Sequence, residues 1–260
     1  KALSLNPDDK NLLNEIANSY AINKRYEGAA KIWTKLLDPN KDNTEDLMRI
    51  GRAYYNGEKY KTADSLFTAV TVKNPKYIPA YLFIARTYSK MDPDLKLGLA
   101  KPKFEKLLDV AKSDSIKNGP EMIEAIGYLG YYHMINDNFS KSKDYYNRMI
   151  NLDLNNKENK LKGYSGIGMV EMRSLLSEKT NEGRLPYLSR ATEAYNKILA
   201  LDTMNASAKS QISSIRDYEA QVKKGINPNE IKGVVKNKAG QPLAYASIRV
   251  KDTAAENLSN

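Results

Sequence analysis

Few side chains in this sequence could carry out covalent chemistry. The 260 residues include no cysteine and a single histidine, His133, which excludes a thiol nucleophile, a disulfide and a cysteine-based zinc site. A Ser-His-Asp triad would have to use His133, and a site with several histidine ligands cannot form. We therefore expect no catalytic residue, no metal site and no cofactor, and we predict that the protein is not an enzyme.

Two short motifs resemble functional loops but lack the context that the chemistry requires. The run Gly163-Tyr-Ser-Gly-Ile-Gly168 is rich in glycine, yet no strand pattern precedes it, as a phosphate-binding loop would need. Ser165 in this run lacks the Gly-x-Ser-x-Gly spacing of a hydrolase nucleophile. Asp92-Pro-Asp94 has too few alternating acids for a calcium loop. A hydrolase is therefore disfavoured.

The composition is that of a folded globular chain, with 41% hydrophobic and 28% charged residues. No stretch approaches the roughly 18 apolar residues that cross a bilayer. We therefore expect no membrane-spanning segment. No nucleic-acid-binding motif and no block of basic residues is present, so we do not expect nucleic acid as a partner. The net charge of +10 leaves two interpretations: solvated basic helix faces, or attraction of an acidic partner.

A repeat of 34 residues organises most of the chain. Small residues recur at this spacing at Ala17, Gly51 and Ala85, and tyrosines recur three residues later at Tyr20, Tyr54 and Tyr88. In the second copy, residues at i, i+4 and i+7 lie on one face of a following helix: Ala63, Phe67 and Val70. Each copy is thus predicted to form two helices, in which the small residue lets the first approach the second closely.

This pattern resembles the tetratricopeptide repeat (TPR) family. Thr44–Tyr77 carries the family pattern almost throughout, at Leu47, Ile50, Gly51, Tyr54, Tyr60, Ala63, Phe67, Val70 and Pro75. The resemblance implies a mainly α fold, a right-handed α-solenoid of stacked helix pairs. It also accounts for the 18 tyrosines against four phenylalanines, because tyrosine at inter-helix positions packs its ring while its hydroxyl reaches the surface.

Residues 1–224 are predicted to contain about five such repeats and a capping helix. His133 falls at the position of the repeated tyrosines, which indicates packing. The polar segment Ser177–Arg184, between the helices of the fifth copy, is predicted to be a loop. Asn205–Lys224 is expected to cap the stack. Lys1–Pro7 matches the end of a preceding copy, so we expect the chain to be a fragment.

Residues 225–260 have a different pattern, which predicts a short β segment. Two alternating runs, Glu230–Lys236 and Pro242–Val250, flank a turn at Gly240. They resemble the start of carboxypeptidase regulatory-like β-sandwich domains, at Ile231, Gly233, Val235, Gly240, Pro242, Leu243, Ala246, Ile248 and Val250. A complete sandwich needs about 100 residues. We expect a partial sandwich that continues beyond this chain, rather than strands packed on the last helices.

The first helices of a helix-pair stack line its concave surface, so ligand-binding residues are sought among their non-packing positions. Asparagine can bond a peptide backbone, arginine can hold a carboxylate, and tyrosine adds apolar area. The predicted ligand-binding residues are Asn14, Asn18, Arg49, Arg52, Tyr55, Arg86, Lys90, Tyr128 and Tyr131. The carboxylate clamp of some TPR proteins is not reproduced, because Arg49 stands where that clamp has an asparagine.

The function predicted from these features is a non-enzymatic protein–protein interaction scaffold that binds a peptide or protein segment, acidic segments included, on its concave face. One alternative is a structural spacer or adaptor in a larger cell-envelope complex that uses its convex face. A weaker alternative is a binder of acidic polymers. The combination of TPR-like and β-sandwich modules resembles exported bacterial proteins, which implies the periplasm or the outer-membrane periphery.

Overall fold

The structure, a computed structural model, describes residues 9–38, 43–115, 117–153 and 155–226. These ranges form eleven α-helices and two 3₁₀ helices, η1 (Lys112–Asp114) and η2 (Leu175–Ser177). The α-helices are α1 (Lys10–Ile22), α2 (Tyr26–Leu36), α3 (Thr44–Asn56), α4 (Tyr60–Lys73), α5 (Ile78–Met91), α6 (Lys101–Ala111), α7 (Gly119–Ile135), α8 (Phe139–Leu152), α9 (Lys157–Ser174), α10 (Asn181–Leu201) and α11 (Ala206–Lys223).

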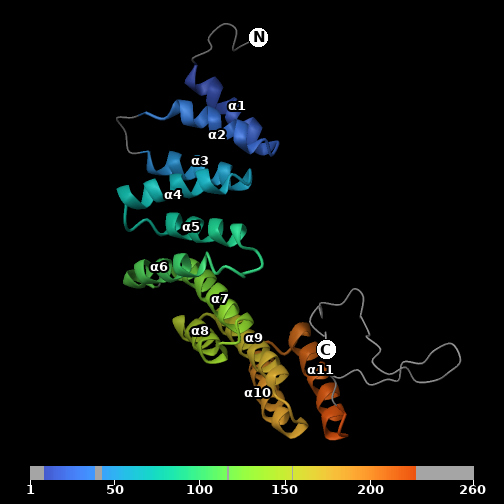
Figure 1. The fold of residues 1–260 in the computed structure, drawn as a ribbon. Helices are drawn as coiled ribbons and strands as arrows, with labels where there is room; N and C mark the ends of the chain where they lie inside the picture. Colours follow the sequence, from blue (N-terminus) through green and yellow to red (C-terminus); the bar gives the residue numbers. More distant parts are fainter. Residues whose placement is uncertain (1–8, 39–42, 116, 154, 227–260) are drawn as a thin grey trace, which may run out of the picture.

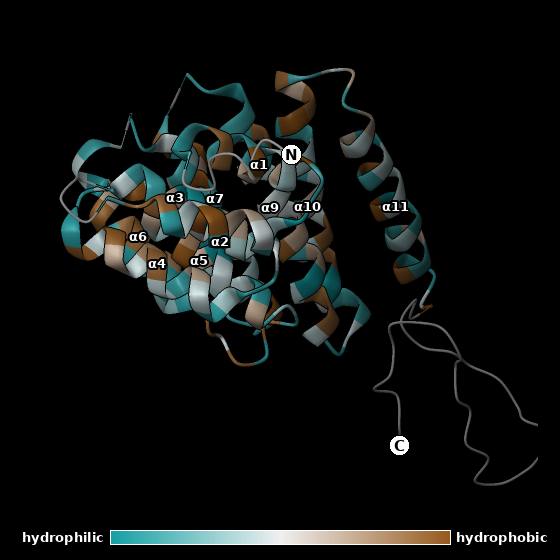
Figure 2. Ribbon diagram, turned by 90° about the horizontal axis from the view of Figure 1, so that it is seen from above, coloured by the Kyte–Doolittle hydropathy of each residue, from teal (hydrophilic) through white to brown (hydrophobic). Residues whose placement is uncertain are grey.

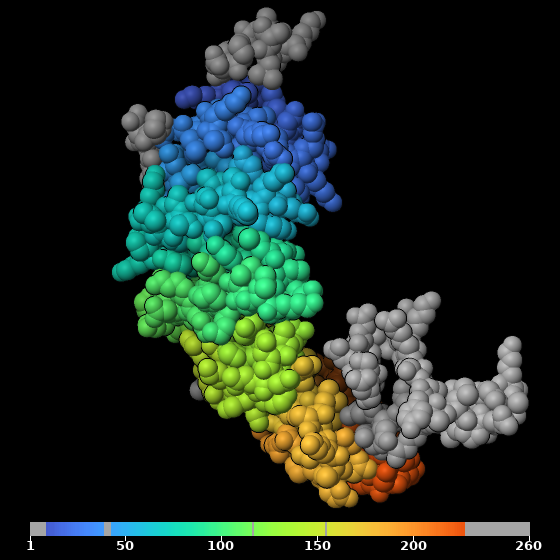
Figure 3. All heavy atoms as spheres, viewed as in Figure 1, coloured from blue at the N-terminus to red at the C-terminus, as the bar shows by residue number. Residues whose placement is uncertain are grey.

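Each helix packs against its neighbours in the chain, so the helices form a stack in sequence order from α1 to α11 (Figure 1). The helix axes change direction between α6 and α7, which gives the molecule an elongated, bent outline (Figure 3). The first helices of successive pairs also contact each other, α3 with α5, α5 with α7 and α7 with α9. We call the surface that α1, α3, α5, α7 and α9 share the first-helix face.

Aromatic rings of the second helices pack against small residues of the first helices, as the repeat pattern predicts. A Cβ atom added at Gly51 would lie 2.5 Å from the Phe67 ring, closer than real Cβ atoms come to other atoms. The equivalent distance from Gly168 to the Tyr195 ring is 2.6 Å. The run Gly163–Gly168 is therefore helical and serves packing, since it lies within α9.

The apolar core is divided into clusters that follow one another along the stack. The first joins α1, α2 and α3 around Trp33, and the last joins α9, α10 and α11 around Leu188. Such local cores are expected when each repeat buries its apolar face only against its neighbours. Along α11, hydrophobic and hydrophilic positions alternate (Figure 2), and the buried ones, Ile212 and Ile215 among them, belong to the last cluster.

The prediction of a loop over Ser177–Arg184 is wrong for its second half, because α10 begins at Asn181. The Thr180 hydroxyl oxygen caps this helix by accepting a hydrogen bond from the Gly183 N–H at 3.0 Å. The Arg184 side chain is buried and donates to the Glu178 carbonyl oxygen at 2.9 Å. These contacts offset the low helix propensity of a polar segment that contains glycine.

The predicted β segment lies outside the described residues, as does Lys1–Pro7. The boundary at residue 224 therefore stays a prediction, although α11 ends next to it, at Lys223. The Asn181 side-chain amide holds this end of α11 by donating to the carbonyl oxygens of Val222 and Ile226, both at 3.3 Å. Within the described ranges, every helix is too short or too polar to cross a membrane.

Candidate functional site

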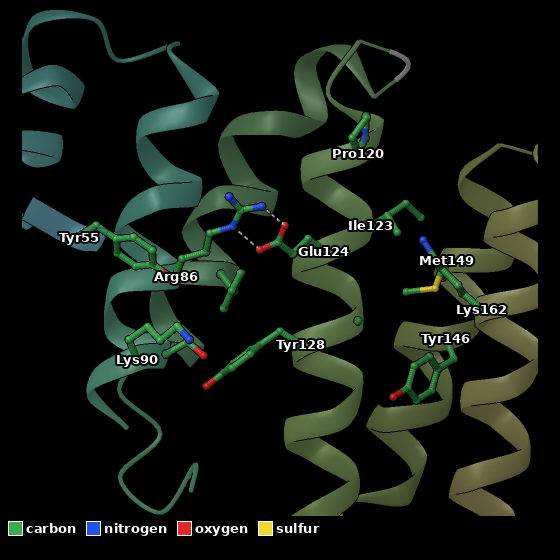
Figure 4. Close-up of a pocket in the computed structure, with 13 residues that line it drawn as sticks. Tyr55, Arg86, Lys90, Pro120, Ile123, Glu124, Tyr128, Tyr146, Met149 and Lys162 are labelled. Carbon is green, nitrogen blue, oxygen red and sulfur yellow. Dashed lines mark hydrogen bonds and ion pairs between the residues drawn. The ribbon is translucent and has the colours of Figure 1, made fainter. Parts of the chain in front are cut away.

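A cavity of about 740 Å³ opens on the first-helix face and extends across four repeats (Figure 4). Its walls come from the first helices α3, α5, α7 and α9, and part of its floor comes from the second helices α6 and α8. The lining residues drawn and labelled in Figure 4 are Tyr55, Arg86, Lys90, Pro120, Ile123, Glu124, Tyr128, Tyr146, Met149 and Lys162. The cavity thus combines aromatic, apolar and charged side chains.

The polar centre of the cavity is an ion pair between α5 and α7. The Arg86 guanidinium donates from Nε to Glu124 Oε1 at 2.6 Å and from Nη2 to Glu124 Oε2 at 2.5 Å. These hydrogen bonds raise the pKa of Arg86. The guanidinium carbon also lies 5.2 Å from the centre of the Phe83 ring. Arg86 is therefore held in place and its charge is balanced within the protein.

Tyr128 forms an aromatic wall of the cavity. Its ring stacks on Phe104 with the ring centres 4.2 Å apart and the planes 27° from parallel. Its hydroxyl is buried without a hydrogen-bond partner in the described part of the chain. Burial raises the pKa of Tyr128 to about 12, so this side chain is neutral at physiological pH.

The two lysines of the cavity differ in their surroundings. Lys162 Nζ on α9 forms an ion pair with Glu158 Oε1 at 2.6 Å, one helical turn away. Lys90, near the end of α5, is exposed and has no ion-pair partner among the described residues. Within the described ranges, the positive charge of the cavity without an ion-pair partner is therefore that of Lys90, across from Tyr128 (Figure 4).

The predicted residues nearer the N-terminus lie outside the cavity lining, and two of them join helices together. Asn14 Oδ1 accepts a hydrogen bond from Trp33 Nε1 at 3.1 Å and another from Arg49 Nη1 at 3.4 Å. The Arg49 guanidinium lies 4.8 Å from the Trp33 ring centre and bonds Asp46 Oδ1 at 2.7 Å. These contacts link α1, α2 and α3. Asn18 and Arg52 are exposed.

The structure therefore brings four predicted binding residues into one cavity, namely Tyr55, Arg86, Lys90 and Tyr128. Tyr131 is 46% exposed but lies outside the lining. Sequence reasoning missed Glu124, although it lies four residues before Tyr128 on α7 and so shares its helix face. The floor residues Tyr146 and Met149 are likewise absent from the predicted set.

His133 is a packing residue, as its place in the repeat predicts. It is 6% exposed, and its ring stacks on Tyr145 with the centres 5.6 Å apart. Burial lowers the pKa of His133, and the positive charge of Lys141 adds to this effect. It lines a second, smaller cavity of about 300 Å³ with charged neighbours. Across the described ranges, no three His, Cys, Asp or Glu side chains gather as a metal site would require.

The stacked helix pairs define a helical repeat fold of the TPR type. The chain resembles the C-terminal part of a TPR repeat-containing protein from Cytophaga hutchinsonii, with 25% identity, a TM-score of 0.47 and coverage of 81% of this chain and 63% of that one. It thus spans less than two thirds of that protein's solved part. No family model matches the chain, and a search of curated proteins finds no match.

Two structures of the protein MamA share this fold. MamA from Desulfovibrio magneticus, residues 41 to the end, is 18% identical, with a TM-score of 0.51 over 76% of this chain and 98% of that one. A double mutant of MamA from strain RS-1 is 19% identical, with a TM-score of 0.52 over 77% and 98% of the two chains. At this level of identity, the similarity shows the fold alone.

Three partly or fully buried tyrosines predict that the protein loses stability in alkali. The pKa values of Tyr77, Tyr128 and Tyr146 are raised to about 12, chiefly by burial. The unfolded chain releases these protons near pH 10, whereas the folded protein retains them. The free energy of unfolding should thus be insensitive to these groups below pH 10 and fall as the pH rises from 10 to 12.

Absorbance at 295 nm and urea unfolding, followed together at pH 8 to 12, check this expectation. At least these three tyrosines should ionise late, as the helical circular dichroism signal is lost. Ionisation of all tyrosines near pH 10 with the fold intact would contradict it.

Proposed function

We propose that the protein is a non-enzymatic scaffold that binds a segment of a partner protein along its first-helix face. The observation that carries the proposal is the open cavity across α3, α5, α7 and α9, with tyrosines, an arginine and an exposed lysine in its lining. Tyrosine and arginine are enriched where proteins bind one another. A solenoid also presents an extended surface, which suits an extended segment.

The N-terminal part of the same face supports a longer binding surface. Arg52 is exposed on α3, with its guanidinium 5.9 Å from the Phe83 ring centre. Phe83 also contacts Tyr55 of the cavity edge to face, with ring centres 5.8 Å apart. A bound segment could therefore pass from the cavity to Arg52 over a continuous aromatic surface. The proposed setting, the bacterial periplasm or outer-membrane periphery, rests on the sequence resemblance alone.

Selection from a phage-displayed library of random 12-residue peptides tests the proposal. We expect peptides to be enriched on the wild-type protein and to lose affinity about tenfold for the double variant Arg52→Glu/Lys90→Glu, measured by fluorescence polarisation. Both side chains are exposed, so reversing their charges should leave the fold intact. Arg49 and Arg86 are left unchanged because they hold contacts within the protein.

The matched control is Lys61→Glu/Lys106→Glu, which makes the same change of charge at exposed positions of the second helices α4 and α6. It should bind the selected peptides as the wild type does. Loss of affinity in this control but not in the first-helix variant would favour the convex-face spacer. Failure to enrich any peptide would contradict the scaffold proposal.

A further inference from the structure

We propose that the cavity recognises a specific kind of segment: one that inserts a large apolar side chain beside Gly127 and places a carboxylate at Lys90, a few residues away. This inference rests on the proposed function, because it names the chemistry of the segment that the first-helix face binds. Three observations support it: an unfilled position on α7, an apolar floor below it, and the distribution of charge around it.

The unfilled position is Gly127, in the interior of α7. A Cβ added there would meet only Met149 Cε, at 3.5 Å, which is an ordinary contact distance. Gly130, nearly one turn further, differs, because its added Cβ would lie 2.9 Å from the Tyr146 ring. Helix packing thus requires glycine at 130 but not at 127. Glycine lowers the stability of a helix interior relative to alanine, so the absence of a side chain at 127 needs another reason.

The space beside Gly127 has a floor suited to an apolar group. Met149 and Tyr146 of α8 lie on this side of α7 in the cavity (Figure 4) and are 3% and 4% exposed. Ile123 adds a branched aliphatic side chain from α7. The flexible thioether of Met149, which lies next to Gly127, can adapt to inserted groups of different shapes. The volume of about 740 Å³ falls within the range of about 300–1,000 Å³ that is usual for ligand pockets.

The charges around this floor favour one position for a carboxylate. Glu124 neutralises Arg86 at the centre of the cavity and would repel a second carboxylate there. Glu158 neutralises Lys162 at the α9 side. Lys90 at the α5 edge has no such partner in the described part of the chain, as shown above. A segment with its apolar side chain beside Gly127 is therefore best matched when its acidic residue points toward α5.

The peptides selected from the random library provide the probe for this inference. We expect them to contain a Trp, Phe, Leu or Met with an Asp or Glu a few residues away, because the two groups would reach different helices of the cavity, α7 and α5. Gly127→Leu should fill the space and lower their affinity at least about tenfold, since burial of a large apolar side chain is lost. Gly127→Ala, which adds only one methyl group, should change it less than about threefold.

A second pair of measurements separates the carboxylate from the apolar anchor and needs no change at Gly127. Replacing the anchor residue of a selected peptide with alanine should lower its affinity for the wild-type protein at least about tenfold. Replacing the Asp of the peptide with Asn should lower its affinity for the wild-type protein. The same replacement should not lower the affinity of the peptide for the Lys90→Gln variant. Circular dichroism and thermal unfolding of each protein variant check that the fold is retained.

The outcomes distinguish the inference from the proposed function. One contrary result is that selected peptides lose affinity for Arg52→Glu/Lys90→Glu and yet bind Gly127→Leu and the wild type equally. Another is that they keep their affinity when the anchor residue is alanine. Either result would overturn the inference and leave the scaffold proposal in place. Equal binding of the Asp and Asn peptides to the wild type would overturn the position of the carboxylate. Failure to select any peptide would overturn both proposals.

Discussion

Replacement of Tyr146 with alanine is expected to lower the free energy of unfolding by about 3–5 kcal/mol. Tyr146 on α8 is 4% exposed and belongs to the cluster that joins α5 to α9. Its ring lies directly against Gly130 of α7 and Gly166 of α9, where an added Cβ would overlap it. The variant would therefore leave a void between three helices from two successive repeats.

The substitution should also make the two parts of the molecule unfold separately, because a solenoid is held together mainly by contacts between neighbouring repeats. We expect urea unfolding to change from one transition to two, with α9–α11 separating from α1–α8. Tyr146→Phe keeps the ring and should remain close to the wild type. Tyr131→Ala, at a 46% exposed position of α7, serves as the surface control. A loss in Tyr146→Ala no larger than in this control would contradict the packing role.

The repeat architecture could be predicted because its signal is local in sequence. Gly51 and Phe67 are 16 residues apart, and the short turn between α3 and α4 brings the two helices side by side so that these residues are in contact. The same small residue and aromatic ring recur at Gly168 and Tyr195, across a longer connection. The helix start at Asn181 was missed because it depends on a threonine cap and a buried arginine in an otherwise polar segment.

The candidate site was predicted only in part, because its geometry depends on how successive repeats are turned against each other. Arg86 and Glu124 are 38 residues apart and meet only through the rotation between α5 and α7. Helix periodicity identifies which side chains leave the packing interface, but it does not show which of them pair. Thus Arg49 and Arg86 looked like free cations in the sequence, whereas the structure gives each an acidic partner.

Removal of both cations that face Glu171 is expected to destabilise the fold strongly. Glu171 on α9 stands where other repeats have tyrosine or histidine, and its side chain is 2% exposed. Lys143 Nζ from α8 lies 3.0 Å from Oε1, and Arg190 Nε from α10 lies 2.8 Å from Oε2. Lys143→Ala/Arg190→Ala would leave a buried carboxylate uncompensated, a change that costs about 3–5 kcal/mol.

We expect the loss at the lower end of that range, because Lys143 and Arg190 are partly exposed and water can reach the space they leave. Adding Glu171→Met to the double variant should restore most of the lost free energy of unfolding, since an apolar side chain of similar size needs no cation. Lys197→Ala, which removes an exposed ion pair with Glu193 on α10, should have little effect in urea unfolding. If the triple variant is no more stable than the double variant, the loss comes from the packing of the two cations' side chains instead of from the unpaired charge.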